Sequence, residues 1–154
     1  MSDSFLRVIP RAPDFVPTSA ASAEAQALLR RALSPVAPAK LQVSGQLYDQ
    51  VQFVDAGENF ERVQCPHCAA ELDLDWWSSA VGDADDSGFQ RLEVILPCCE
   101  ATTSLNTLAY VLPQGFAKYV LEVTNPGVDS PEPTVTEQLS AILGCAVQLI
   151  WARY

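Results

Sequence analysis

The spacing of the cysteines constrains the fold of this chain more than any other feature. Four of the five cysteines lie in two clusters, 65–68 and 97–99, which are far apart in the sequence. Structural zinc sites use four tetrahedral ligands, often supplied as pairs from two tight turns. The sequence therefore predicts a zinc-ribbon-like site whose ligands are Cys65, Cys68, Cys98 and Cys99.

The second ligand pair is irregular, because Cys98 and Cys99 are adjacent where a zinc ribbon usually has two intervening residues. Neighbouring side chains diverge, so both thiols reach one ion only if the backbone curls around it. If one of them does not bind, His67 or a nearby carboxylate is the alternative fourth ligand.

The length and composition indicate one globular domain spanning residues 1–154. The chain is 49% hydrophobic and 18% charged, which is typical of a folded domain. It has no apolar run long enough for a membrane span, and its first residues lack the pattern of a secretory signal. We expect a cytoplasmic protein, in which cysteines persist as thiols or metal ligands.

Acidic residues dominate the segment between the two cysteine clusters. The chain carries a net charge of −10, and residues 71–100 contain eight acids and one base, Arg91. Phosphate backbones repel such a segment, so nucleic-acid binding is disfavoured, and a basic protein partner is favoured. The alternative is that these acids only form a solvated surface. They are Glu71, Asp73, Asp75, Asp83, Asp85, Asp86, Glu93 and Glu100.

The outer parts of the chain have the element order of a ferredoxin-like α+β sandwich. Alternating apolar residues predict a strand at 5–9, and helical spacing predicts a helix from about 19 to 33, ended by Pro35 and Pro38. Further strands are predicted at 41–43, 51–54, 119–123 and 146–152. Thr134 to Glu137 forms a capping box for a second helix, which Gly144 ends. This order, βαββαβ, places the cysteine-bearing region 60–111 as an insertion between the second and third core strands.

Within the insertion, the sequence predicts a helix that begins near Asp75 and is closed by the segment from Gly82 to Gly88. A strand at 89–96 and a polar turn at 102–106 follow, and 108–112 is a further strand. Adjacent residues on a helix face different ways, so we expect one of Trp76 and Trp77 to cover the zinc site and the other to be partly exposed. The residues that we assign to partner binding are Trp76, Trp77, Asp83, Asp85 and Asp86.

An enzyme is the main alternative, and it uses the same cysteines. Cys65-Pro66-His67-Cys68 resembles the active-site motif of DsbA-like thiol oxidoreductases, which implies Cys65 as the nucleophile and Cys68 as the resolving thiol. Other catalysis is hard to assemble, since His67 is the single histidine and the glycines form no phosphate-binding loop.

Several stretches resemble a family of small bacterial zinc-ribbon-like proteins that has no assigned activity. The stretches are 4–10, the Cys-Pro-x-Cys turn, Trp76-Trp77, Pro97-Cys98-Cys99, 103–106, 121–126 and 150–154. The resemblance implies a bacterial cytoplasmic protein with a ribbon-like metal site.

Together these features favour a non-enzymatic, acidic protein-binding domain with a structural zinc. The concrete form of this hypothesis is an immunity or antitoxin-like protein that occludes a basic effector. The alternatives are the thiol oxidoreductase and a structural subunit of a larger assembly.

Overall fold

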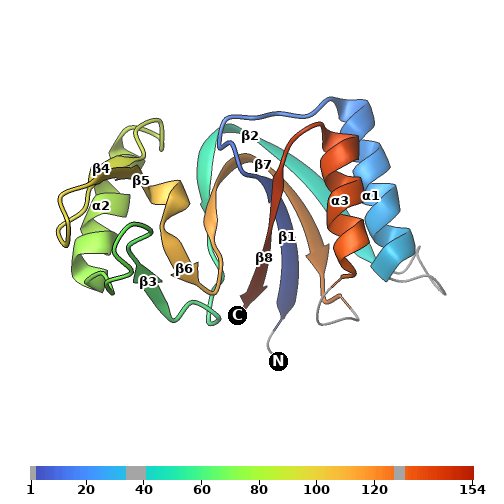
Figure 1. The fold of residues 1–154 in the computed structure, drawn as a ribbon. Coiled ribbons are helices and arrows are strands. Elements are labelled where there is room, and N and C mark those ends of the chain that lie inside the picture. Colours follow the sequence, from blue (N-terminus) through green and yellow to red (C-terminus); the bar gives the residue numbers. More distant parts are fainter. Residues whose placement is uncertain (1–2, 34–40, 127–130) are drawn as a thin grey trace.

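A four-stranded antiparallel sheet and a smaller cysteine-bearing part lie side by side in the molecule (Figure 1). The computed structural model describes residues 3–33, 41–126 and 131–154, and it is an α+β structure. The sheet consists of β1 (Ser4–Pro10), β2 (Gln42–Val54), β7 (Gly115–Thr124) and β8 (Val147–Arg153), in the order β2-β7-β1-β8.

The register of the sheet follows from its apolar residues. Leu6 in β1 lies opposite Val123 in β7 and Trp151 in β8. The two central strands, β1 and β7, are largely buried, and this explains why β7 is nearly continuously apolar. The order of hydrogen-bonded neighbours therefore places the N-terminal strand in the middle of the sheet.

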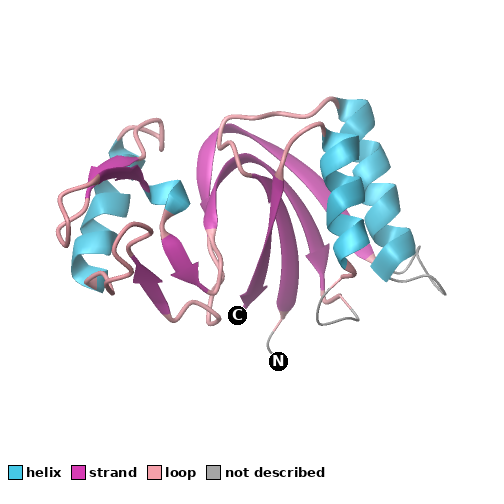
Figure 2. Cartoon of the chain, in the orientation of Figure 1, coloured by secondary structure: helices cyan, strands magenta, loops and turns pink. Residues whose placement is uncertain are grey.

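Two helices, α1 (Ser19–Leu33) and α3 (Pro133–Leu143), cover one face of this sheet (Figure 2). Leu29 of α1 and Leu139 of α3 are fully buried against Leu121 of the sheet. Gly144 ends α3 with a φ of 82°, a left-handed conformation that glycine adopts without a side-chain clash. The buried members of this helix–sheet core come from residues 6–43 and 119–147 alone.

The cysteine-bearing part is built from short elements around its own core. It contains β3 (Arg62–Gln64), α2 (Leu74–Asp86), β4 (Glu93–Ile95), β5 (Thr102–Ser104), the 3₁₀ helix η2 (Leu105–Thr107) and β6 (Ala109–Val111). β3 pairs with β6, and β4 pairs with β5. Val51 of β2 and Phe116 of β7 belong to the same core, so the ends of two sheet strands anchor this part.

Several expected boundaries were wrong. The strands predicted at 41–43 and 51–54 belong to one strand, β2, whose pairing with β7 is irregular between Leu47 and Gln52. The strand predicted at 89–96 comprises only Glu93–Ile95, and the predicted turn at 102–106 contains β5 and the start of η2. The prolines expected to end α1, Pro35 and Pro38, lie outside the described residues.

Two helix boundaries also differ from the sequence patterns. α2 does not close at Gly82 but continues to Asp86, because tertiary packing of Ala84 outweighs the low helix propensity of glycine. The capping box at Thr134 does not form, because the N-cap is Glu132 and Thr134 lies inside the first turn of α3. Pro133 is the first helical residue, a position where proline is favoured. None of the helices in the described part of the chain is both long and apolar enough to cross a membrane.

Candidate metal centre

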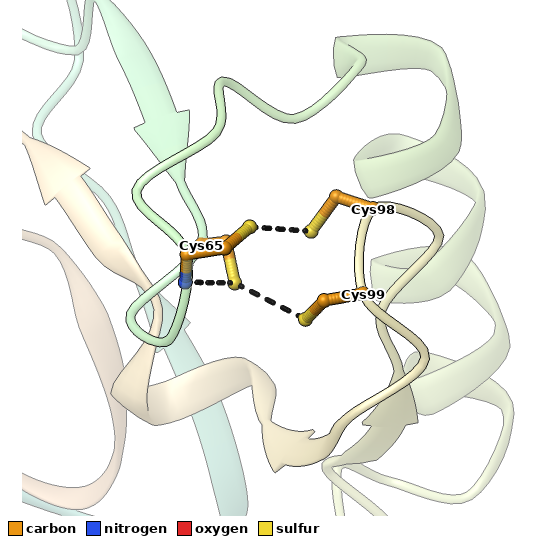
Figure 3. A group of neighbouring side chains, drawn as sticks. Cys65, Cys98 and Cys99 are labelled. Carbon is orange, nitrogen blue, oxygen red and sulfur yellow. Dashed lines mark hydrogen bonds between the residues drawn. The ribbon is translucent and has the colours of Figure 1, made fainter.

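The structure brings the four predicted ligands together. The Sγ atoms of Cys65, Cys68, Cys98 and Cys99 all lie within 4.8 Å of one another. Cys65 Sγ is 3.8 Å from Cys99 Sγ, and Cys68 Sγ is 3.4 Å from Cys98 Sγ, all four being free thiols (Figure 3). Two thiolates bound to a tetrahedral zinc at about 2.3 Å lie about 3.8 Å apart. The four thiols therefore have the spacing that one metal ion requires.

A tight turn of 65–70 holds the first pair. Cys65 N donates to Ala70 O at 2.8 Å, and Ala69 N donates to Cys65 O at 3.0 Å, with Ala69 at a φ of 62°. The backbone amides of His67 and Cys68 both donate to Cys65 Sγ at 3.3 Å. These two amides favour a thiolate at Cys65, because they place positive charge density beside the sulfur.

A second turn, 96–101, repeats this backbone. Leu96 N donates to Ala101 O at 2.9 Å, Glu100 N donates to Leu96 O at 2.9 Å, and Glu100 has a φ of 61°. Leu96 thus occupies the place in the second turn that Cys65 occupies in the first. Leu96 is fully buried in the core of the cysteine-bearing part, so an apolar side chain fills the position where a ribbon has its third cysteine.

This correspondence accounts for the adjacent cysteines. Cys99 stands at the place of Cys68, and Cys98 stands at the place of His67, one residue earlier in the curled turn. Figure 3 shows the side chains of Cys98 and Cys99 both directed towards the first turn. His67 is exposed and is not part of the four-thiol group, which leaves the cysteines as the ligand set that the geometry favours.

The ligands differ in their exposure. Cys65 is 2% exposed and belongs to the apolar core, whereas Cys68, Cys98 and Cys99 are exposed to solvent. The site therefore has one sulfur anchored in the core and three at the surface. Solvent and thiol reagents can reach these three without unfolding of the chain.

In the metal-free state, the pKa values of Cys65 and Cys98 shift in opposite directions. Burial opposes ionisation of Cys65, but the amides of Cys68 and His67 and the neighbouring thiols outweigh it and lower its pKa to about 6. Partial desolvation of its sulfur, hydrogen bonds to neighbouring thiols and the nearby Cys65 thiolate raise the pKa of Cys98 to about 12. The metal-free group therefore favours a thiolate at Cys65 and a protonated thiol at Cys98, whose proton a metal ion can replace.

The two tryptophans lie in different surroundings. The ring centroid of Trp77 is 5.8 Å from Phe53 of β2 and 5.2 Å from Phe60, and its Nε1 donates to Tyr110 Oη at 3.1 Å. Tyr110 Oη in turn donates to the carbonyl of Leu105 at 2.6 Å. Trp77 therefore joins the cysteine-bearing part to the sheet, which is a structural role.

Trp76 is also half-buried, and it lines a groove between α2 and β4. The three aspartates assigned to partner binding, Asp83, Asp85 and Asp86, are exposed in the last turns of the same helix. Trp76 and this acidic helix end therefore lie on one element, apart from Trp77 and its aromatic neighbours.

Comparison of the chain with models of protein families, with curated proteins and with solved structures gave no match. The resemblance to small bacterial zinc-ribbon-like proteins stays a prediction.

Proposed function

We propose that Cys65, Cys68, Cys98 and Cys99 bind one structural zinc ion. The observation that carries this proposal is the mutual approach of all four Sγ atoms to within 4.8 Å on two similar turns. Four thiolates in a tetrahedron suit zinc or iron, and zinc needs no redox partner. Such ligands persist in a reducing compartment, which supports a cytoplasmic location.

We further propose that the chain is a non-enzymatic protein-binding domain whose partner is basic. The support is the concentration of exposed acids on α2 and around it, in a chain with a net charge of −10. An immunity or antitoxin-like protein that occludes a basic effector is the concrete form of this proposal. The alternative, a structural subunit of a larger assembly, would use the same acidic surface. It differs from the immunity-like proposal only in the partner that this surface binds.

The proposed scaffold is a ferredoxin-like sandwich with residues 60–111 inserted. The strand order β2-β7-β1-β8, together with one helix between β1 and β2 and another between β7 and β8, supports this classification. The insertion leaves the sheet after β2 and returns at β7, two strands that are neighbours. The metal-bearing part therefore extends from one end of the sheet without interrupting its pairing.

The thiol-oxidoreductase alternative rests on the low pKa of Cys65. Against it, Cys65 is buried and starts a turn, while the next helix, α2, begins only at Leu74. The attacking thiol of such enzymes is reactive because it is accessible at a helix N-terminus. Here the accessible thiols are the other three of the group.

The deciding experiment measures metal content and free thiols in protein purified without a chelator. We expect one zinc per chain, and four thiols that react only after chelation, in the wild type and in the Cys145→Ser control. Cys65→Ser and Cys99→Ser should lose the zinc. Absence of zinc and iron, together with one rapidly reacting acidic thiol, would overturn the structural role and support the redox alternative.

A separate capture experiment tests the partner. Wild-type protein on a resin is compared with the Asp83→Lys, Asp85→Lys, Asp86→Lys triple variant and with a matched Glu24→Lys, Glu58→Lys, Glu137→Lys triple variant. We expect a basic protein from the native host to bind the wild type and the matched control, but not the α2 variant. Equal binding by all three proteins would contradict the acidic docking surface.

A further inference from the structure

The cysteine-bearing part contains a groove between α2 and β4, with a volume of about 450 Å³. Trp76, Ala80 and Asp83 line it from the helix, and Glu93, Val94 and Ile95 line it from the strand. Val94 packs against the same core as Trp76 and Ala80, so the helix supports one face of the strand. The groove therefore has a helix as one wall and a strand as the other. Figure 1 shows α2 and β4 as neighbouring elements.

The strand that forms this wall is an edge. β4 pairs with β5 in a sheet of two strands, so among the described residues only one side of β4 is paired. Leu96 N donates to Ala101 O, and Leu92 O accepts from Leu105 N. The backbone N–H and C=O groups of residues 92, 94 and 96 therefore point toward β5. In an antiparallel ladder successive residues alternate, so Glu93 and Ile95 direct their N–H and C=O groups to the other side. A strand edge of this kind can pair with an added strand.

The side chains along the groove specify the chemistry of its occupant. Ile95 is 67% exposed although it is a large apolar residue, and Trp76 is only half-buried. Asp83 and Glu93 outnumber the single base, Arg91, and the helix continues to the exposed Asp85 and Asp86. The groove thus combines an apolar wall with a net negative rim.

We propose that the α2–β4 groove binds an extended peptide segment in which apolar residues alternate with lysine or arginine, as a third strand beside β4. Every second side chain of such a strand falls on the Val94 side, against Trp76 and Ala80, and the others fall on the Glu93 side. The main chain supplies affinity through hydrogen bonds to Glu93 and Ile95, and the acids select the basic residues. This inference rests on the proposed function and specifies its docking mode.

The test uses the zinc-loaded, ¹⁵N-labelled full chain and an acetylated, amidated peptide of sequence Lys-Val-Lys-Val-Lys-Thr. A second peptide of the same sequence carries N-methyl groups on the backbone nitrogens of its lysines. When the peptide pairs antiparallel to β4 with its lysines on the Glu93 side, these are the donors that face Glu93 and Ile95. We expect the first peptide to shift the amide signals of 93–95 and the Trp76 indole and to slow amide exchange at Ile95. The methylated peptide should bind at least about tenfold more weakly, because the strand bonds cannot form.

Two variants test whether a loss of peptide binding arises from the lost strand bonds or from misfolding. Ile95→Pro removes an outward N–H without touching the β5 ladder, and prolines are tolerated at such edges. It should abolish peptide binding while zinc content and the β4–β5 signals are retained. Ile95→Ala keeps the N–H and should retain measurable binding.

Two outcomes overturn the docking mode and leave the acidic-surface proposal to its own capture experiment. The first is equal binding of both peptides with shifts spread over the acidic residues of α2, which indicates charge attraction alone. The second is no shift at 93–95 with either peptide.

Discussion

At the residue scale, Cys65 differs from the other three ligands of the proposed site. It is buried, it belongs to an apolar core, and its sulfur accepts two backbone hydrogen bonds. The other three thiols are exposed and can be replaced with less disturbance of packing. The contribution of each cysteine to folding should therefore be unequal even though each supplies one sulfur.

We expect Cys65→Ser to lower both zinc binding and stability, and Cys68→Ser to lower mainly zinc binding. Serine in place of Cys65 puts a hydroxyl in the core and weakens its amide contacts, at a cost of about 1–3 kcal/mol in the metal-free protein. Urea unfolding of metal-free variants measures this difference, with Cys145→Ser as the control. Equal destabilisation by both ligand substitutions would contradict the unequal roles.

The low pKa of Cys65 makes the metal-free protein sensitive to pH. Its folded pKa of about 6 lies below the ordinary value of 9.0, so the thiolate favours the folded state. This contribution is complete above pH 9.0, declines as the pH falls towards 6, and is absent below it. Ultraviolet absorbance of the thiolate, taken as wild type minus Cys65→Ser, should titrate near pH 6; a midpoint near 9.0 would show that the amides do not act on the sulfur.

At the element scale, α2 has carboxylates at both ends and no base in its last turn. Asp73 caps the N-terminus, its Oδ1 accepting from Asp75 N at 2.7 Å, and this matches the positive end of the helix dipole. Asp83, Asp85 and Asp86 lie at the negative end, where carboxylates are unfavourable. An acidic end that opposes the stability of its own helix is consistent with a surface kept for a partner.

The two ends of α2 should respond oppositely to a lysine. Asp86→Lys is expected to stabilise the protein by about 0.3–1 kcal/mol, and Asp75→Lys to destabilise it by a similar amount, because lysine favours the negative end of the dipole only. Urea unfolding at low ionic strength measures both variants. The same Asp86→Lys change should weaken partner capture, which separates a binding role from a stabilising one; stronger capture would count against the acidic surface.

At the scale of the whole molecule, the sheet carries two clusters of buried side chains and the cysteine-bearing part has a third. Trp77 contacts Phe53, Phe60 and Tyr110 within the cluster of the cysteine-bearing part, and its centroid lies 6.0 Å from that of Tyr110. Phe60 also packs against the cluster that contains Val54 and Ile150 of the sheet. The helix–sheet core takes none of its buried members from residues 44–118. The sheet with α1 and α3 can therefore persist when the cysteine-bearing part loosens.

Removal of the metal by a chelator should affect the cysteine-bearing part and the sheet differently. We expect removal of the metal to abolish the amide-exchange protection of β3, α2 and β6 and to leave that of β1 and β7 largely unchanged, since metal binding supplies much of the folding free energy of small zinc domains. Hydrogen exchange before and after chelation measures this, and restored zinc should restore the protection. Loss of protection throughout the sheet would show that the two parts fold as one unit.

Trp77 should matter more for stability than Trp76, although they are neighbours in the sequence. We expect Trp77→Ala to cost about 3–5 kcal/mol, because it removes a large ring that packs among Phe53, Phe60 and Tyr110. Trp76→Ala should cost less, since Trp76 lines the α2–β4 groove. Urea unfolding of the zinc-loaded variants measures the difference; similar losses would contradict the assigned placement.

The sequence determined the local features of this protein. Proline, glycine and apolar periodicity located α1, α3, β1 and β8, because these signals act through neighbouring residues and helix or strand geometry. The cysteine clusters also identified the four thiols that lie together, since few arrangements of two such turns can serve another purpose. The α+β class followed from the order of these elements.

Only the tertiary structure decided what depends on distant contacts. Gly82 does not stop α2, because Ala84 packs into a core formed with residues from β2 and β7. Cys98 and Cys99 reach the same site because Leu96, buried in that core, occupies the first position of the second turn. The contacts of Trp77 with Phe53, Phe60 and Tyr110 separate it from Trp76, which lines the α2–β4 groove. Among the described residues, β4 has an unpaired edge because β5 pairs with its other side. Each of these outcomes depends on contacts between residues far apart in the sequence, and a local sequence pattern does not predict such contacts.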